Sequence, residues 1–252
     1  MNETIRILGL GFFSGTAEEA VAVARQGGLV VAPSGPGLAD MPGDAVYRAA
    51  LEAADVRLLD SGLLAWLWEW RHKRPAPRIS GYLFLTHFLQ LPDIAASGAC
   101  LWVAPSPAAA EHTRTWLAKE RGLAAPPESW YVAPDYTRDA VADEALLALV
   151  RKGRPRFIFI CVGGGPQEKL GAWLKARLDY RPTILCTGAA IAFLTGEQAP
   201  IPYWADRARL GWLLRILHEP RKFLPRYWQA RRLVSLYRRW GEDAPPSVKS
   251  GK

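Results

Sequence analysis

Short apolar runs alternate with amphipathic segments along most of the chain. The apolar runs, such as residues 29–31 and 157–160, are rich in β-branched and aromatic residues, which is typical of buried strands. The segments between them repeat their apolar residues at helical spacing. We predict strands at residues 5–9, 28–33, 56–59, 78–80, 99–103, 130–133, 156–162 and 183–187. We predict helices at residues 16–26, 44–54, 61–71, 82–89, 107–121, 140–152 and 167–177.

This alternation predicts an α/β fold with a mainly parallel, Rossmann-like sheet covered by helices. The chain has 252 residues, of which 50% are hydrophobic, and this is enough for one sizeable core. We expect that core in an α/β domain at residues 1–200. A helical appendage at residues 201–240 and a disordered tail at residues 241–252 are expected to follow.

Three candidate site residues, Asp60, Gly163 and Gly188, each lie directly after a predicted strand. The carboxyl ends of parallel strands meet at one edge of a sheet, and ligands bind in the crevice outside that edge. We therefore expect these three segments, which are distant in sequence, to converge on one cleft.

The glycine turn after residues 157–162 is the most informative stretch of the sequence. It reads Gly163, Gly164, Gly165, Pro166, Gln167 and Glu168. Glycines lack the Cβ atoms that would hold a ligand away from the backbone, and proline suits the first turn of a helix. Because backbone N–H groups at a helix N-terminus bind anions, the turn predicts a phosphate site. The alternative is an ordinary connection between a strand and a helix.

Positive charge is concentrated near the C-terminus. Residues 207–239 contain ten arginine and lysine residues and the single acid Glu219, a local net charge of +9, whereas the whole chain carries +8. Aromatic and leucine side chains alternate with these charges. Such helices are typical of the headgroup region of anionic membranes, so we expect a basic amphipathic, membrane-associating appendage. Nucleic acid binding and an ordinary solvated helix face are the alternatives, and we expect no nucleic acid partner.

Other residue types narrow the class of protein. Cys100, Cys161 and Cys186 are expected to be reduced thiols, because two of them lie in apolar strand-like runs. The four histidines have no ligand-like spacing and no Asp-x-Asp motif occurs, so we expect no metal site. The sequence has neither a signal-peptide pattern nor an uncharged apolar run of about 18 residues. We therefore expect a cytoplasmic protein associated peripherally with the inner face of the cell membrane.

Several short motifs follow one another along the chain. They are Thr16-Ala17-Glu18-Glu19-Ala20-Val21, Asp60-Ser61-Gly62, Arg78-Ile79-Ser80-Gly81, the turn at residues 162–168, the segment at residues 188–196 and the tail at residues 211–227. In this order they resemble the TxEEAV, DGxG, RxxG, VGxGxPxQE, GAxFDFxxG and GLEWLxRLxxEPxRxxRY segments of the WecG/TagA/CpsF glycosyltransferases, glycosyltransferase family 26. The resemblance spans roughly residues 6–227.

The resemblance implies an inverting, metal-independent glycosyltransferase. It would move a sugar from a UDP-sugar to a polyprenyl-diphosphate-linked saccharide in bacterial surface polysaccharide or exopolysaccharide synthesis. A hexosyl or N-acetylhexosaminyl donor and no cofactor are implied. Asp60 is implied as the general base that removes the proton of the acceptor hydroxyl. The alternative for Asp60 is a helix N-cap, because aspartate is a favoured capping residue.

Further site residues follow from the same resemblance. Donor binding is implied for Gly163, Gly164, Gly165, Gln167, Glu168, Gly188 and Arg78. Contact with the diphosphate or the lipid acceptor is implied for Arg215, Arg221 and Arg226. The alternative for each arginine is an ordinary surface charge. Several polar positions of the family differ here, for example Ala192, which stands where the family has aspartate. We therefore expect altered substrates.

Two other functions stay open. The run Gly9-Leu10-Gly11 suggests a nicotinamide-dependent oxidoreductase, although the spacing is GxGxxxG rather than GxGxxG and no acid follows the next strand. A non-catalytic, membrane-peripheral scaffold of a polysaccharide assembly complex would keep the fold and the tail without turnover. The oligomeric state is open as well, and the sequence is compatible with a homo-oligomer.

Overall fold

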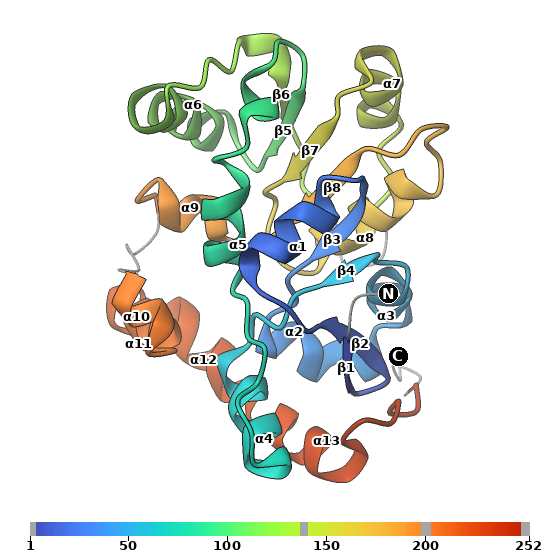
Figure 1. Ribbon diagram of the computed structural model, residues 1–252, viewed down its shortest axis with the longest axis vertical. Helices are drawn as coiled ribbons and strands as arrows, with labels where there is room; N and C mark the ends of the chain where they lie inside the picture. The colour runs from blue at the N-terminus through green and yellow to red at the C-terminus, as the bar shows by residue number, and fades with distance from the viewer. Residues whose placement is uncertain (1–3, 137–140, 198–202, 248–252) are drawn as a thin grey trace.

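The computed structural model describes residues 4–136, 141–197 and 203–247, and its centre is a six-stranded parallel sheet (Figure 1). The strands lie in the order β4-β3-β8-β7-β5-β6. Their bounds are β3 (Gly28–Val31), β4 (Val56–Arg57), β5 (Cys100–Ala104), β6 (Trp130–Val132), β7 (Phe157–Ile160) and β8 (Thr183–Cys186). The expected α/β fold with a parallel, Rossmann-like sheet is confirmed.

Successive residues of each central strand face opposite sides of the sheet, and each side carries its own apolar core. In β7, Ile158 and Ile160 join the first core, whereas Phe157 and Phe159 join the second. The first core is covered mainly by α3 (Ala45–Glu52), α7 (Glu144–Gly153) and α8 (Pro166–Lys175). The second is covered mainly by α1 (Ala17–Ala24), α5 (Gly81–Phe88) and α6 (Pro107–Arg121). A sheet buried on both faces explains why its strands read as continuous apolar runs.

The N-terminal strand differs from our expectation. Residues 5–9 do not join the main sheet, because β1 (Thr4–Ile7) and β2 (Leu10–Phe13) form a separate antiparallel hairpin. Gly9 lies in the turn of this hairpin, and a Cβ atom there would approach Ala244 Cβ to 2.6 Å. The glycine run therefore allows close packing of the C-terminal segment. It does not connect a parallel strand to a helix, which is the geometry a dinucleotide fingerprint requires.

The remaining helices follow the strands β3, β4 and β8 in sequence or form the C-terminal part of the chain. They are α2 (Gly35–Asp40), α4 (Gly62–His72), α9 (Ala190–Leu194), α10 (Tyr203–Arg207), α11 (Gly211–His218), α12 (Pro220–Ala230) and α13 (Arg232–Trp240), with 3₁₀ turns at Met41–Gly43, Pro92–Ala95 and Pro127–Ser129. In α13, Leu233 and Tyr237 are buried in the first core. The last part of the expected appendage is therefore packed into the α/β body. The expected boundary at residue 200 lies outside the described residues.

The segment after α13 is held against the N-terminal part of the chain. Leu8 and Gly9 donate backbone hydrogen bonds to the carbonyls of Gly241 and Glu242 at 2.8 and 2.9 Å. Arg48 donates to the carbonyl of Pro245 at 2.7 Å. Our expectation of a disordered tail is wrong for residues 241–247, because these contacts fix the backbone. Residues 248–252 lie outside the described part of the chain.

Helix capping explains one wrong expectation and one helix that was not predicted. The strand predicted at residues 78–80 does not form, because Ser80 caps α5 and its Oγ accepts a hydrogen bond from Leu83 N at 3.0 Å. α2 was not predicted, because its glycines and proline are typical of a turn. Ser34 begins this helix by accepting a hydrogen bond from Gly37 N at 3.3 Å.

Candidate functional site

Asp60 lies between the end of β4 and the start of α4. Ser61 is the N-cap of α4, and its Oγ accepts a hydrogen bond from Leu64 N at 3.3 Å. Asp60 instead accepts, through Oδ1, the N–H of Gly81 at 3.0 Å. The capping alternative for Asp60 is therefore wrong. Its carboxylate joins the end of β4 to the first turn of α5.

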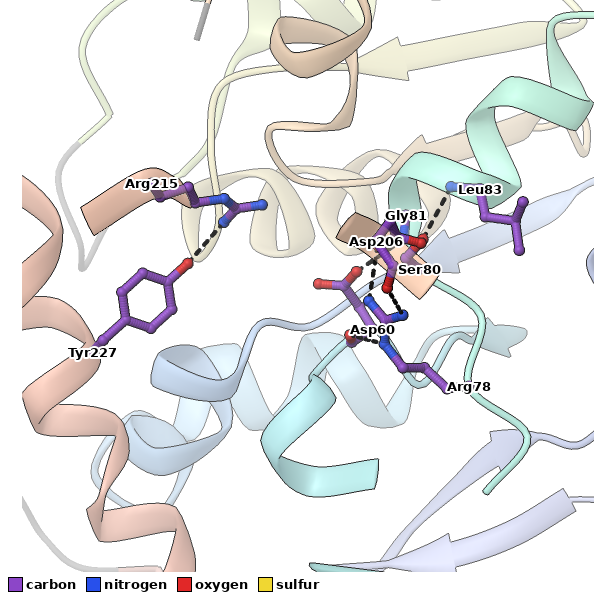
Figure 2. Close-up of polar contacts among 8 residues, drawn as sticks. All are labelled: Asp60, Arg78, Ser80, Gly81, Leu83, Asp206, Arg215 and Tyr227. Carbon is purple, nitrogen blue, oxygen red and sulfur yellow. Dashed lines mark hydrogen bonds and ion pairs between the residues drawn. The ribbon is translucent and has the colours of Figure 1, made fainter. Parts of the chain in front are cut away.

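Arg78 connects Asp60 to the C-terminal helices. Its Nε donates to the Asp60 carbonyl at 3.1 Å, and its Nη1 and Nη2 donate to the carbonyl and Oδ1 of Asp206, each at 2.9 Å (Figure 2). Ser80 Oγ donates to Asp206 Oδ2 at 2.7 Å. Asp60, Arg78, Ser80, Gly81 and Asp206 thus form one connected group, which we call the Asp60 cluster. Arg78 is engaged with the protein here, and its contact with a donor stays a prediction.

Asp206 is the member of this cluster that the sequence analysis missed. It lies on α10, 128 residues from Arg78 in sequence, and both side chains are mostly buried. A lone aspartate in a helix among basic residues resembles an ordinary surface residue. The only signal available was that it is one of two acids at residues 203–219, in a segment otherwise rich in arginine.

The Asp60 cluster lies beside the ends of two central strands. A Cβ atom on Gly81 would lie 2.7 Å from the Thr187 carbonyl oxygen and 3.3 Å from Ala32 Cβ. Thr187 follows β8 and Ala32 follows β3. Glycine at position 81 therefore lets α5 begin in direct contact with the carboxyl ends of these strands, which brings Asp60 to the same edge of the sheet.

Burial raises the pKa of Asp60 above the ordinary value of an aspartate. Arg78, the Gly81 N–H and Arg215 partly oppose this increase in the pKa, and the negative charge of Asp206 adds to it. A carboxylate with a raised pKa accepts a proton more readily than an exposed one. The environment of Asp60 therefore suits a general base.

Of the three predicted arginines, the structure brings Arg215 toward the site. Its guanidinium carbon lies 4.1 Å from the centre of the Phe193 ring, and its Nη1 donates to Tyr227 Oη at 3.1 Å (Figure 2). Its buried Nε has no hydrogen-bond partner within the described part of the protein. Arg221 is exposed at the start of α12. The side chain of Arg226 lies outside the described residues.

The glycine turn has the open backbone that its sequence predicts. Gly163 and Gly165 have φ angles of +93° and +97°, and a Cβ atom on either would have no neighbour among the described residues within 4 Å. Glu168 folds back, however, and its Oε2 accepts the N–H of Gly165 at 2.6 Å. Because its carboxylate offsets part of the positive end of the helix dipole, the start of α8 is less attractive to phosphate than the glycines alone suggest.

Gln167 leaves one polar atom unsatisfied beside this turn. The residue is fully buried, and its Nε2 donates to Glu168 Oε1 at 3.0 Å. Its Oε1 has no hydrogen-bond partner among the described residues. A Cβ atom on Gly188 would lie 3.9 Å from Gln167 Nε2, so the segment after β8 passes next to this side chain. An unpaired amide oxygen accepts a hydrogen bond from a ligand hydroxyl or N–H, and buried groups of this kind are rare.

A cavity of about 210 Å³ opens from the glycine turn. It is lined by residues at the ends of β5 and β7, at the start of β6, and in or beside α6 and α9: Ala104, Pro105, Ala109, Thr113, Trp130, Cys161, Val162, Gly163, Ala189, Ile191, Ala192 and Glu197. Pockets for whole ligands usually enclose ~300–1,000 Å³, so this one suits only part of a nucleotide sugar. Burial raises the pKa of Cys161 to about 12, and this thiol is therefore neutral rather than nucleophilic.

The described residues contain no group of three or more histidine, cysteine, aspartate or glutamate side chains that could hold a metal ion. None of the helices in the described ranges is long and apolar enough to cross a bilayer. Cys100, Cys161 and Cys186 are free thiols.

Comparison with protein-family profiles gave a match over most of the chain. The profile of the family described as "Glycosyl transferase WecG/TagA/CpsF family" matches residues 5–243. No curated protein sequence matched the chain. The matched region includes both the Asp60 cluster and the glycine turn, and it extends through α13. The resemblance inferred from the short motifs is confirmed.

Proposed function

Because the chain belongs to the WecG/TagA/CpsF family of glycosyltransferases, we propose that it moves a sugar from a UDP-sugar to a polyprenyl-diphosphate-linked saccharide. The reaction inverts the anomeric carbon and requires no metal ion or cofactor. The donor is a hexose or N-acetylhexosamine, and the product serves bacterial surface polysaccharide or exopolysaccharide synthesis. The observation that supports this proposal best is the position of the Asp60 carboxylate, which the Gly81 N–H holds beside the carboxyl ends of β3 and β8.

Asp60 acts as the general base in this mechanism. Its carboxylate takes the proton from the acceptor hydroxyl as the oxygen forms a bond to the anomeric carbon of the donor. The bond between that carbon and the diphosphate oxygen breaks on the opposite side, and UDP leaves with the bonding electrons. The hydrogen bond from Gly81 N to Oδ1 fixes the orientation of the carboxylate. Arg78 orients the same segment through the Asp60 carbonyl.

The donor binds along the glycine turn. Gly163 and Gly165 leave room for its diphosphate beside the backbone, and Gln167 Oε1 accepts a hydrogen bond from a hydroxyl or N–H of the donor. Gly188 keeps the opposite wall of this site close to Gln167. Arg215 supplies positive charge as negative charge develops on the departing UDP.

The acceptor reaches the enzyme at the cytoplasmic face of the membrane, to which the protein binds peripherally. The exposed aromatic residues Trp204, Trp212 and Trp228 of α10–α12, together with the basic residues of the same helices, support this location. Arg221 and Arg226 contact the lipid-linked diphosphate or the phospholipid headgroups.

Thermal unfolding with UDP tests the donor site. A ligand present at one hundred times its dissociation constant stabilises the native state by about 2.7 kcal/mol, so UDP should raise the melting temperature. NAD is the control and should leave it unchanged. A shift with NAD alone would contradict the proposal and favour an oxidoreductase.

A non-catalytic scaffold of a polysaccharide assembly complex is the second candidate. It is favoured by Ala192, which lines the cavity at a position where the family has aspartate. UDP-sugar consumption in the presence of a polyprenyl-diphosphate saccharide separates the two, because a scaffold would bind the membrane without turnover.

A further inference from the structure

The exposed tryptophans of this protein are concentrated on a few helices. Within the described ranges, the tryptophans with the most accessible side chains are Trp66 and Trp70 of α4 and Trp204, Trp212 and Trp228 of α10–α12. Those on α10–α12 belong to the region already proposed to contact the membrane. Trp66 and Trp70 do not belong to that region, because α4 is the helix that follows strand β4 of the α/β domain. Their exposure therefore needs a separate explanation.

α4 has two faces of different character. Leu64, Leu67 and Trp68 are buried in the first core, and they account for the attachment of the helix to the protein. Trp66 and Trp70, one helical turn apart, lie on another face with 56% and 57% of their surface exposed. Two large aromatic side chains side by side in water are unfavourable, and contiguous exposed apolar surface marks a contact with a partner.

The charges near these tryptophans indicate what that partner is. Arg71, Lys73 and Arg74 are exposed at the end of α4, and Lys73 Nζ lies 5.4 Å from the centre of the Trp70 ring. The acid of this helix, Glu69, is already paired with Arg209 at 2.6 Å. Exposed positive charge beside tryptophan is complementary to anionic phospholipid headgroups, where the indole ring lies at the boundary of headgroup and acyl chain.

The neighbouring helix extends the same basic surface. α13 packs against α4, and both lie at the same end of the molecule (Figure 1). Arg238 and Arg239 are exposed on α13. This end of the protein therefore combines the α4 tryptophans with positive charge from two helices that share one core.

We propose that α4 is itself a membrane-contacting element, which places Trp66 and Trp70 in the headgroup region of an anionic bilayer. The binding surface then includes the α/β domain as well as the C-terminal helices. α4 begins at Gly62, two residues after Asp60. Contact of α4 with the bilayer consequently fixes the height and orientation of Asp60 above the membrane. This last step rests on the proposed function, because it concerns a lipid-linked acceptor, whereas the contact itself does not.

The test uses point variants of the full chain. Deleting the C-terminal helices would also remove Leu233 and Tyr237 from the core, and so would confuse binding with folding. We would compare the wild type with Trp66→Ser/Trp70→Ser by sedimentation with vesicles of equimolar phosphatidylglycerol and phosphatidylcholine. The matched control is Val46→Ser/Val132→Ser, which replaces exposed apolar residues on other elements. A third variant, Lys73→Gln/Arg74→Gln, tests the charges.

We expect the tryptophan variant to lose about tenfold or more in its partition onto anionic vesicles, since binding follows the apolar area inserted. The control should bind as the wild type does. The charge variant should bind less at low salt, and the wild type should bind poorly to pure phosphatidylcholine. Unchanged partition of the tryptophan variant would overturn the proposal. Conversion of a wild-type dimer to a monomer by the same variant, with vesicle binding kept, would assign this face to a second copy and overturn it too.

Two further measurements separate this proposal from the proposed function. The melting shift with UDP and the turnover of a water-soluble acceptor analogue should be the same in the tryptophan variant and the wild type. Turnover of a vesicle-bound polyprenyl-diphosphate acceptor should fall. If UDP has no effect on any of these proteins but the tryptophan variant still loses vesicle binding, the membrane contact stands and the glycosyltransferase proposal fails.

Discussion

Asp60 and Gln167 lie at the same edge of the sheet, yet their surroundings differ. The Asp60 carboxylate belongs to a connected group in which Arg78, Ser80 and Asp206 satisfy one another. Gln167 is buried, its Oε1 has no hydrogen-bond partner in the part of the chain that the structure describes, and the glycines beside it border open space there. The hydrogen bonds around Asp60 are thus formed before any substrate binds. The Gln167 side has a polar atom that a bound ligand can satisfy.

This difference corresponds to two roles in the proposed reaction, that of the general base and that of the donor site. A general base must be held in a fixed position, because proton transfer requires hydrogen-bond distance to the acceptor. A donor site gains specificity when its buried polar atoms are paired only by the right ligand. Substitutions at the Asp60 side should therefore change turnover or stability, and those at the glycine turn should change donor affinity.

The largest effect is expected from Asp60→Asn. Loss of a general base lowers the rate by about 10²–10⁴-fold, and asparagine keeps an acceptor for the Gly81 N–H. Turnover of the UDP-sugar should fall by this factor, while the melting shift with UDP should persist. Asp179→Asn, which changes an exposed carboxylate, is the control and should have wild-type turnover. Wild-type turnover in Asp60→Asn would remove Asp60 as the base.

Asp206→Ala should be the most destabilising change. Removing one partner of a buried ion pair leaves the other charge unpaired and costs about 3–5 kcal/mol. Urea denaturation measures this loss. Asp179→Ala breaks the exposed pair with Arg154 and should leave the denaturation midpoint nearly unchanged. Equal stabilities of the two variants would show that the link between α10 and Arg78 contributes little.

Gly163→Ala should affect donor binding beyond its effect on folding. A residue with a side chain at positive φ costs about 1–2 kcal/mol, and the added methyl group would also stand at the open side of the turn. Gly122→Ala is the matched control, because Gly122 also has positive φ and open space around it but lies at the end of α6. Both variants should have a lower melting temperature than the wild type, and only Gly163→Ala should bind UDP more weakly. Equal UDP affinities would place the diphosphate elsewhere.

The smallest effects should appear in the pH dependence of Asp60. Its pKa in the folded protein is raised above the ordinary value of 3.8, so the folded state binds more protons than the unfolded state between these two values. The contribution of Asp60 to stability is therefore fully present below pH 3.8 and is lost as the pH rises through the raised pKa. The difference in unfolding free energy between the wild type and Asp60→Asn should follow this trend.

The pH dependence of turnover reports the pKa of Asp60 independently of stability. The acidic limb of the pH–rate profile should lie above the ordinary aspartate range, because the base acts in its ionised form. Asp206→Asn should move that limb to lower pH, since the negative charge of Asp206 raises the pKa of Asp60. A limb that does not move would show that Asp206 has only a structural role.

The sequence predicted the glycine turn well because its structure is local. The run of apolar residues before Gly163 forms β7, and Pro166 begins α8 as its position in the pattern indicated. It also placed Asp60 at the end of a strand. It did not predict the hairpin at residues 4–13, because an isolated apolar run does not reveal which partner its strand will pair with. Nor did it predict that Glu168 folds back onto Gly165.

What the sequence by itself determined was most of the alternation of strands and helices, the motifs that carry the family and the open backbone at the glycine turn, since each element and each motif depends on residues close together in the chain. Only the tertiary structure decided that Asp206 pairs with Arg78 across 128 residues, and that burial raises the pKa of Asp60. It also decided that α13 buries Leu233 in the main core while α4 leaves Trp66 and Trp70 exposed. Burial and long-range pairing depend on which surfaces meet after folding, and the spacing of residues along a chain does not record this.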